Sequence, residues 1–298
     1  MQLTRWTYVA REGFTLRGWH SPPSGKPLLH FIHGNGFCGL TYEPMLGQLT
    51  DDFDLWISDA QGHGDSDHGG RFVGWNRSAE LAMEALQAHQ PLFGDVTQFA
   101  MGHSFGGVLT CLALANHPQQ FQRAVILDPV LFSPQMLWAI TMAKWVGLSG
   151  NHELARKARQ RRQHWPDRPS VIESLRGRGA YKGWSPESLQ AFAEHALRPA
   201  ADGGVELKCA PERESDIFST GPEGLWTALN EVQTPTQVIH AQDSFPFVAS
   251  SVRQWQSINP RVEALQTVGG HCFMQENPVK TAQLVRQFLI DPAQPIIK

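Results

Sequence analysis

Short apolar runs alternate with longer amphipathic segments over the first part of the chain, and this rhythm predicts alternating strands and helices. Strands are expected at Pro27–Ile32, Phe53–Ser58, Val96–Met101 and Arg123–Leu127. Helices are expected between them at Thr41–Leu49, Ser78–His89 and Val108–Ala115. Strands that alternate with helices favour a parallel sheet covered by helices on both faces.

The two ends of the chain complete this α/β pattern. Thr4–Val9 and Phe14–Trp19 alternate polar and apolar residues around a turn, so the chain is expected to open with a hairpin at the edge of the sheet. Near the other end, Thr236–His240 and Val262–Val268 resume the strands, and Pro278–Ile290 has the spacing of an amphipathic helix.

The middle of the chain has a different pattern. Beyond Asp128-Pro129, up to about Asn230, the segments are helix-like and no convincing run of alternating strands appears. We interpret residues 130–230 as an inserted helical cap, with residues 1–129 and 231–298 forming the core. The apolar run Val130–Leu148 contains Pro134, Gln135 and Lys144, so it predicts a buried or pocket-lining helix and no membrane insertion.

Composition narrows the possible partners. The 298 residues are 41% hydrophobic and 18% charged, as in an ordinary globular protein, and the net charge of −3 favours no nucleic acid partner. Met1–Phe14 lacks the apolar stretch of a signal peptide, so a cytoplasmic location is expected. The four cysteines lack CxxC spacing and are predicted to be reduced and mostly buried. No pattern in the sequence defines an oligomeric state.

The stretch Met101–Gly107 carries the clearest chemical signal. An apolar strand stops at Gly102-His103-Ser104-Phe105-Gly106, and an apolar helical run follows. This pattern is typical of a GxSxG nucleophile elbow, in which a strained turn pushes the serine hydroxyl above the edge of the sheet. Strand and helix approach closely at such a turn, so a Cβ at Gly102 or Gly106 is expected to clash.

Four further motifs follow the same order as in one known family. They are His33-Gly34-Asn35-Gly36, the loop Asp59–Ser66, Gln242-Asp243 after a late strand, and Gly270-His271 with Glu276 and Pro278. Together with the elbow, they resemble the α/β-hydrolase superfamily, of the serine hydrolase type with a helical cap. The resemblance covers the two core segments and only weakly the cap. It implies the α/β-hydrolase fold.

The predicted catalytic residues are Ser104, Asp243 and His271. A serine hydroxyl needs an imidazole to take its proton, and the imidazole needs a carboxylate to hold its tautomer. The three residues occur in the chain order typical of this fold, just past strand ends. Asp128 also follows a strand and is the alternative acid, but its place before Pro129 also suits a turn. We favour Asp243 because of its strand position. His33 and His103 are interpreted as structural.

Backbone amides are expected to form the oxyanion hole. The amide of Phe105 lies at the start of the helix after the nucleophile, and the second donor is predicted to be the amide of Asn35. Gly36 is the alternative, because HGxG loops differ in which amide faces the substrate. The Asn35 side chain is a further candidate for a polar contact in the pocket.

Two polar clusters have both a structural and a functional interpretation. The first, in the loop after the second predicted core strand, does not match zinc or calcium spacing, so we predict a turn without metal; it comprises Asp59, His63, Asp65, Asp67 and His68. The second, in the cap, suits a solvated helix face or an anion site; it comprises Arg156, Lys157, Arg159, Arg161 and Arg162. The apolar cap residues Met136, Trp138, Ile140, Met142 and Trp145 suit either an acyl pocket or the core of the cap.

The predicted function is hydrolysis of a carboxylic ester of a small or medium apolar acid through an acyl-serine intermediate, with a small-molecule substrate and no cofactor. Relatives that cleave carbon–halogen bonds or epoxides carry aspartate where this chain has Ser104. Thioester hydrolysis, lactone opening and carbon–carbon cleavage use the same triad and remain alternatives. A small-ligand receptor on the same fold is the alternative from another class, which a complete triad disfavours.

Overall fold

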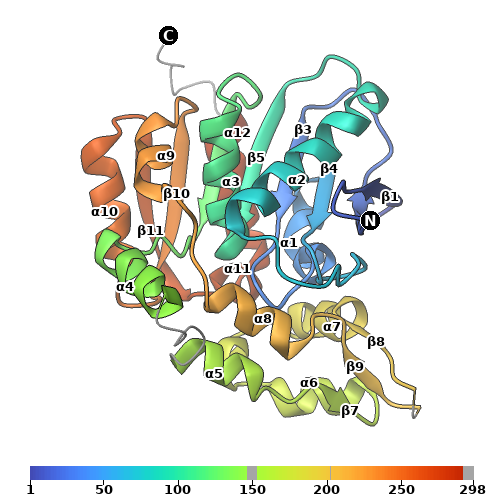
Figure 1. The fold of residues 1–298 in the computed structure, drawn as a ribbon. Coiled ribbons are helices and arrows are strands. Elements are labelled where there is room, and N and C mark those ends of the chain that lie inside the picture. The colour runs from blue at the N-terminus through green and yellow to red at the C-terminus, as the bar shows by residue number, and fades with distance from the viewer. Residues whose placement is uncertain (146–152, 202, 291–298) are drawn as a thin grey trace.

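The computed structural model describes residues 1–145, 153–201 and 203–290 of the chain. An eight-stranded sheet lies at its centre, in the order β1-β2-β4-β3-β5-β6-β10-β11 (Figure 1). The strands are β1 (Thr4–Val9), β2 (Thr15–His20), β3 (Leu28–Ile32), β4 (Asp54–Asp59), β5 (Gln98–His103), β6 (Arg123–Leu127), β10 (Thr236–Asp243) and β11 (Val262–Gly270). The pairs β1/β2 and β2/β4 are antiparallel, and the other pairs are parallel. The predicted mostly parallel α/β sheet is confirmed.

Helices cover both faces of this sheet. One apolar core lies beneath α2 (Trp75–His89), α3 (Phe105–Asn116), α9 (Leu225–Glu231) and α10 (Val248–Ile258). A second core lies beneath α1 (Glu43–Leu46), α11 (Phe273–Glu276) and α12 (Pro278–Ile290). Every residue of β3 and β4 is buried, which explains why apolar residues follow one another in Leu28-Leu29, Phe31-Ile32 and Leu55–Ile57 without alternating with exposed polar ones. All four cysteines are buried and free, as predicted.

The inserted segment forms a separate layer at one end of the sheet (Figure 1). Its helices are α5 (Glu153–Arg159), α6 (Arg168–Leu175), α7 (Pro186–His195) and α8 (Pro211–Phe218). It also contains a three-stranded antiparallel sheet of β7 (His164–Trp165), β8 (Leu197–Pro199) and β9 (Val205–Leu207). These strands were not predicted from the sequence, because two or three residues are too few to show a period of two.

The boundaries of the inserted segment stay a prediction. Helix α9 starts inside the predicted segment 130–230 and ends at Glu231, yet its Leu225 and Leu229 pack into the core beneath α3 and α10. The apolar side chains of this helix therefore stabilise the main sheet, not the layer formed by α5–α8.

The apolar residues of helix α4 (Pro134–Trp145) were expected to line an acyl pocket or to form the core of the cap, and the structure differs from both expectations. Met136 and Ile140 pack against the core, but Trp138 is 67% exposed and Trp145 is 83% exposed. Residues 146–148 of the apolar run lie outside the described residues. Among the helices that the structure describes, none has the length and apolar character needed to cross a bilayer.

Candidate active site

The turn between β5 and α3 holds Ser104 in a rare backbone conformation. Its φ is 54° and its ψ is −115°, in a region that residues with a Cβ seldom adopt. A Cβ on Gly102 would lie 2.3 Å from the carbonyl oxygen of Gly106, and a Cβ on Gly106 would lie 2.2 Å from that of Ile32. Both glycines are therefore required by the close approach of helix and strand, as the GxSxG pattern predicts.

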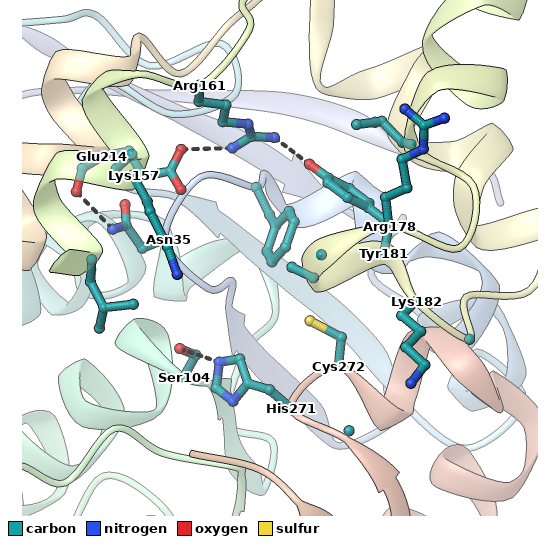
Figure 2. Close-up of a pocket in the computed structure, with 18 of the residues that line it drawn as sticks. Asn35, Ser104, Lys157, Arg161, Arg178, Tyr181, Lys182, Glu214, His271 and Cys272 are labelled. Atoms are coloured by element: carbon teal, nitrogen blue, oxygen red, sulfur yellow. Dashed lines mark hydrogen bonds and ion pairs between the residues drawn. The ribbon is translucent and has the colours of Figure 1, made fainter. Parts of the chain in front are cut away.

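The hydroxyl of Ser104 meets the imidazole of His271. Ser104 Oγ lies 2.9 Å from Nε2 of His271, within hydrogen-bond distance (Figure 2). On the other side of the ring, Nδ1 of His271 donates to Oδ2 of Asp128 across 2.5 Å. Asp128 is fully buried, whereas the side chain of His271 is 20% exposed. An aspartate that accepts the Nδ1 proton leaves Nε2 free to accept a proton from the serine.

The structure corrects the predicted acid. Asp243 was expected to hold His271, but its side chain is exposed at the end of β10 and lines the cavity above the site. The carboxylate that binds His271 belongs to Asp128, the alternative residue. Asp128 also accepts a hydrogen bond from the amide of Ala241 at 2.7 Å and one from the hydroxyl of Ser244.

Strand register explains this correction. Leu127 pairs with His103 on β5 and with Ile239 on β10, so Asp128 follows β6 at the same level as Ser104 follows β5. Asp243 lies four residues beyond Ile239, past a register shift in β10. Asp243 pairs with Gly270 on β11, next to His271, but its side chain is exposed. Asp128 also has a left-handed backbone, with φ 43°, which turns the chain at this point.

A second histidine supports the loop that carries His271. His103 Nε2 donates to the carbonyl oxygen of His271 at 3.0 Å, and His103 Nδ1 accepts the hydroxyl of Tyr42 at 2.6 Å. Tyr42 in turn accepts the amide of Gly34 at 3.1 Å. Burial, together with the nearby His271, lowers the pKa of His103 well below its ordinary value, so this ring stays neutral. Sequence reasoning did not identify Tyr42, because no motif includes it.

His33 also has the structural role that the sequence suggested. Its Nδ1 donates to the carbonyl oxygen of Gly34 at 2.8 Å, and its Nε2 accepts the amide of Ala60 at 3.1 Å. Burial lowers its pKa to about 4, which keeps the ring neutral near pH 7. His33 therefore joins the loop after β3 to the loop after β4.

The two candidate oxyanion amides of the first loop differ in their surroundings. The amide of Gly36 donates to Nε2 of His63 at 3.1 Å. Burial lowers the pKa of His63 well below its ordinary value, and its Nδ1 donates to the carbonyl oxygen of Gln61. The N–H of Gly36 therefore donates its hydrogen bond to a neutral imidazole. Phe105 begins α3, and the N–H groups of a first helical turn have no carbonyl partner within the helix.

Asn35 also connects the core to the inserted layer. Its side-chain Nδ2 donates to the main-chain oxygen of Glu214 on α8 at 3.0 Å (Figure 2). The Glu214 carboxylate accepts from Arg161 at 2.6 Å, and Arg161 also donates to the hydroxyl of Tyr181. Burial acts to lower the pKa of Arg161, but Tyr181 and Glu214 outweigh it and raise that pKa.

The acidic side chains of the loop after β4 bind backbone amides and basic side chains of the protein. Asp59 accepts the amides of Gly39 and Asp65, while burial raises its pKa to about 6. Asp65 forms ion pairs with Arg5 and Lys208. In the part of the chain that the structure describes, no three histidine, cysteine, aspartate or glutamate side chains are grouped to hold a metal ion.

A cavity of about 840 Å³ opens above Ser104 and His271, between the core and the inserted layer. Ser104 and His271 lie at one end of it, with Lys157 on one wall and Arg178, Tyr181 and Lys182 on the opposite wall (Figure 2). Its apolar lining consists of Phe37, Leu154, Ala158, Trp165, Leu175, Ala180, Phe218, Phe245 and Cys272. The arrangement can hold a small molecule with a carbonyl carbon against the serine.

Comparison with known proteins identifies the family and the fold of the chain. A sequence model of the alpha/beta hydrolase family matches residues 31–284. The chain is 22% identical over 270 residues to a 2-(acetamidomethylene)succinate hydrolase of Mesorhizobium japonicum, with 88% of each chain covered. It is 27% identical over 201 residues to a type I acyl-CoA thioesterase of Penicillium roqueforti, covering 60% of this chain and 42% of that one. The crystal structure of E-2-(acetamidomethylene)succinate hydrolase superposes with a TM-score of 0.77 at 21% identity, covering 97% and 99% of the two chains.

Proposed function

The chain belongs to the alpha/beta hydrolase family, and from this premise we propose that it is a serine hydrolase acting on a carboxylic ester through an acyl-Ser104 intermediate. The observation that carries the proposal is the continuous hydrogen-bonded series from Ser104 Oγ through His271 to Asp128. Each member has the partner that its role requires. A ligand-binding protein would have no use for such a series.

In the first half of the reaction, His271 Nε2 removes the proton of Ser104 as Oγ attacks the ester carbonyl. The imidazolium that forms keeps its proton on Nδ1 and donates it as a hydrogen bond to Asp128, whose negative charge stabilises the ring. The amide of Phe105 and the amide of Asn35 are the proposed donors to the oxyanion, since Gly36 already donates to His63. Collapse of the tetrahedral intermediate expels the alcohol, which takes the proton from His271.

The second half repeats these steps with water. His271 Nε2 accepts a proton from water as the water oxygen attacks the acyl carbonyl of Ser104. The same two amides hold the second oxyanion, and the proton then returns to Ser104 Oγ as the acid leaves. The buried Asp128 keeps one tautomer of His271 throughout, because its second oxygen is fixed by the amide of Ala241.

The cavity supports a small or medium acyl group with a largely apolar portion. Phe37, Phe218 and Phe245 are among the side chains that line it beside the charged ones. Two of the relatives are named for 2-(acetamidomethylene)succinate hydrolysis and for acyl-CoA thioesterase activity. Thioester hydrolysis by the same triad is therefore the second candidate, and lactone opening and carbon–carbon cleavage remain further alternatives.

The test is release of p-nitrophenol from acyl esters of increasing chain length by the wild-type protein and by Ser104→Ala. We expect turnover that depends on chain length and falls by at least about a thousandfold in Ser104→Ala. A fluorophosphonate probe should label the wild type at Ser104 and leave the variant unlabelled. Absence of both turnover and labelling would contradict the proposal and favour a receptor.

A further inference from the structure

The charged side chains around the cavity are mostly basic. Five cations and three acids line it. The cations are Lys157, Arg161, Arg162, Arg178 and Lys182, and the acids are Glu214, Asp243 and Glu276. The surplus of positive charge contrasts with the whole chain, whose net charge is −3. A cavity with a surplus of one sign of charge in its lining favours ligands of the opposite sign.

Partners within the protein account for some of these charges. Arg161 is neutralised by Glu214 at 2.6 Å, and Glu276 accepts the amide of Gly270 at 2.8 Å. Lys157 pairs with Glu153 at 2.6 Å, although both side chains are about two-thirds exposed. Solvent weakens an exposed pair of this kind, so Lys157 keeps most of its attraction for an anion.

Arg178 and Lys182 have no such partner among the residues that the structure describes. Among the described residues, neither side chain forms a hydrogen bond or ion pair, and both lie exposed on the cavity wall opposite Lys157 (Figure 2). Arg162 is held differently, because it donates to the carbonyl oxygen of His164 and packs over the ring of Trp165. The unpartnered positive charge is therefore concentrated on the segment that carries Arg178 and Lys182.

The backbone of this segment places both cations at the cavity. It joins α6 to α7 and contains Gly177, Gly179 and Gly183, with φ values of 72°, 53° and 81°. Glycine adopts such values without strain, so the chain turns three times within seven residues. Between these turns Tyr181 is buried beside Arg161, and this fixes the segment that presents Arg178 and Lys182.

We infer that the substrate carries an anionic group, a carboxylate or a phosphate, remote from the scissile carbonyl, and that Arg178 and Lys182 bind it. This inference rests on the proposed function and names its substrate class. The apolar lining receives the portion of the substrate between the two ends. Arg178 can donate two parallel hydrogen bonds to a carboxylate or phosphate, and Lys182 adds a point charge.

The first experiment compares two esters that differ only in charge. The substrates are the mono-p-nitrophenyl ester of glutaric acid and the same compound with its free carboxylate methylated. We expect the wild type to have the higher kcat/KM for the charged ester and to lose that preference as sodium chloride is raised. In the double variant Arg178→Gln/Lys182→Gln, kcat/KM should fall about tenfold for the charged ester and stay within about twofold for the neutral one.

Arg176→Gln is the matched control. Arg176 lies on the same segment and is exposed, but it does not line the cavity. This variant should keep the wild-type preference for the charged ester. Equal losses in the double variant for the charged and the neutral member of a substrate pair would overturn the inference and leave the serine hydrolase intact. The same holds if the wild type prefers the charged member neither in this pair nor in the thioester pair described below.

A second pair of substrates locates the anion. An acyl-CoA carries phosphates on its leaving group, and the matching acyl-pantetheine lacks them. If the double variant loses kcat/KM only for the glutarate ester, the bound anion lies on the acyl chain. If it loses kcat/KM only for acyl-CoA, the bound anion lies on the leaving group. If neither ester nor thioester is cleaved and the fluorophosphonate probe does not label Ser104, the proposed function itself fails.

Discussion

Asp128 and His271 lie 143 positions apart in the chain, yet Oδ2 of Asp128 accepts the Nδ1 proton of His271 across 2.5 Å. The carboxylate is fully buried, and its other oxygen accepts the amide of Ala241. These contacts hold the carboxylate in place and give the imidazole one orientation. They make Asp128, and not Asp243, the residue whose replacement should disable the site.

Asp128→Asn should lower kcat by about a thousandfold or more, because an amide favours the wrong tautomer of His271. The asparagine oxygen can still accept the amide of Ala241, so the variant should fold. Asp243→Asn is the matched control, with kcat expected within about threefold of the wild type because the side chain is exposed. Steady-state kinetics on a p-nitrophenyl ester measures both. A larger loss in Asp243→Asn would reverse the assignment.

Tyr42→Phe tests whether the hydrogen bonds behind the site position His271. Loss of the hydroxyl leaves Gly34 N–H and His103 Nδ1 without their partner. We expect kcat to fall about tenfold with KM within about twofold, since His103 holds the carbonyl of His271 but touches no substrate. A variant that loses thermal stability while keeping the wild-type kcat would show that Tyr42 has a purely structural role.

Gly106→Ala should destabilise the protein by at least about 3 kcal/mol or prevent folding, because the new Cβ would lie 2.2 Å from a backbone oxygen. The oxygen belongs to Ile32 in β3, and Gly106 lies in α3, so relief of the clash would disturb one of these elements. Gly47→Ala is the comparison, since its Cβ would have no neighbour nearer than 3.8 Å and its φ is −59°. Urea denaturation should show Gly47→Ala within about 1 kcal/mol of the wild type. Equal stability of the two variants would contradict the close approach at the elbow.

Acid should unfold this protein more readily than its acidic residues alone would suggest. Burial lowers the pKa of His30 to about 3 and of His33 to about 4, and places those of His63 and His103 well below the ordinary value. The unfolded chain therefore binds more protons than the folded one below about pH 6.5.

It follows that the free energy of unfolding should fall as pH is lowered from 6.5 to 4, by up to about 1.4 kcal/mol per pH unit for each histidine. Asp59 acts in the opposite direction, because its pKa of about 6 lets the folded state take up a proton first. Urea titrations at pH 7.5, 6 and 5, at one ionic strength, measure the combined effect of the histidines and Asp59 on the free energy of unfolding. Stability that stays level over this range would show that the buried histidines do not resist protonation.

Much of this protein followed from local patterns in the sequence. The central strands contain consecutive apolar residues because both faces of the sheet are covered, and such stretches can be identified without the fold. Gly102 and Gly106 are required by close contacts between neighbouring elements, so the elbow has a local signature. His271 is identified in the same way, by its place directly after the last strand.

Contacts between residues on different strands could be identified only from the tertiary structure. Asp128 and Asp243 both follow a strand, and only the register of β6 between β5 and β10 brings one of them to His271. The partners of Gly36 and His103 come from other loops, so no local pattern contains them. Arg178 and Lys182 appear in sequence as two more surface cations, and folding of the inserted segment places both beside one cavity. Periodicity and spacing report on neighbours along the chain, whereas the carboxylate that contacts His271, the partner of the Gly36 amide and the charge of the cavity depend on residues that meet only in the folded molecule.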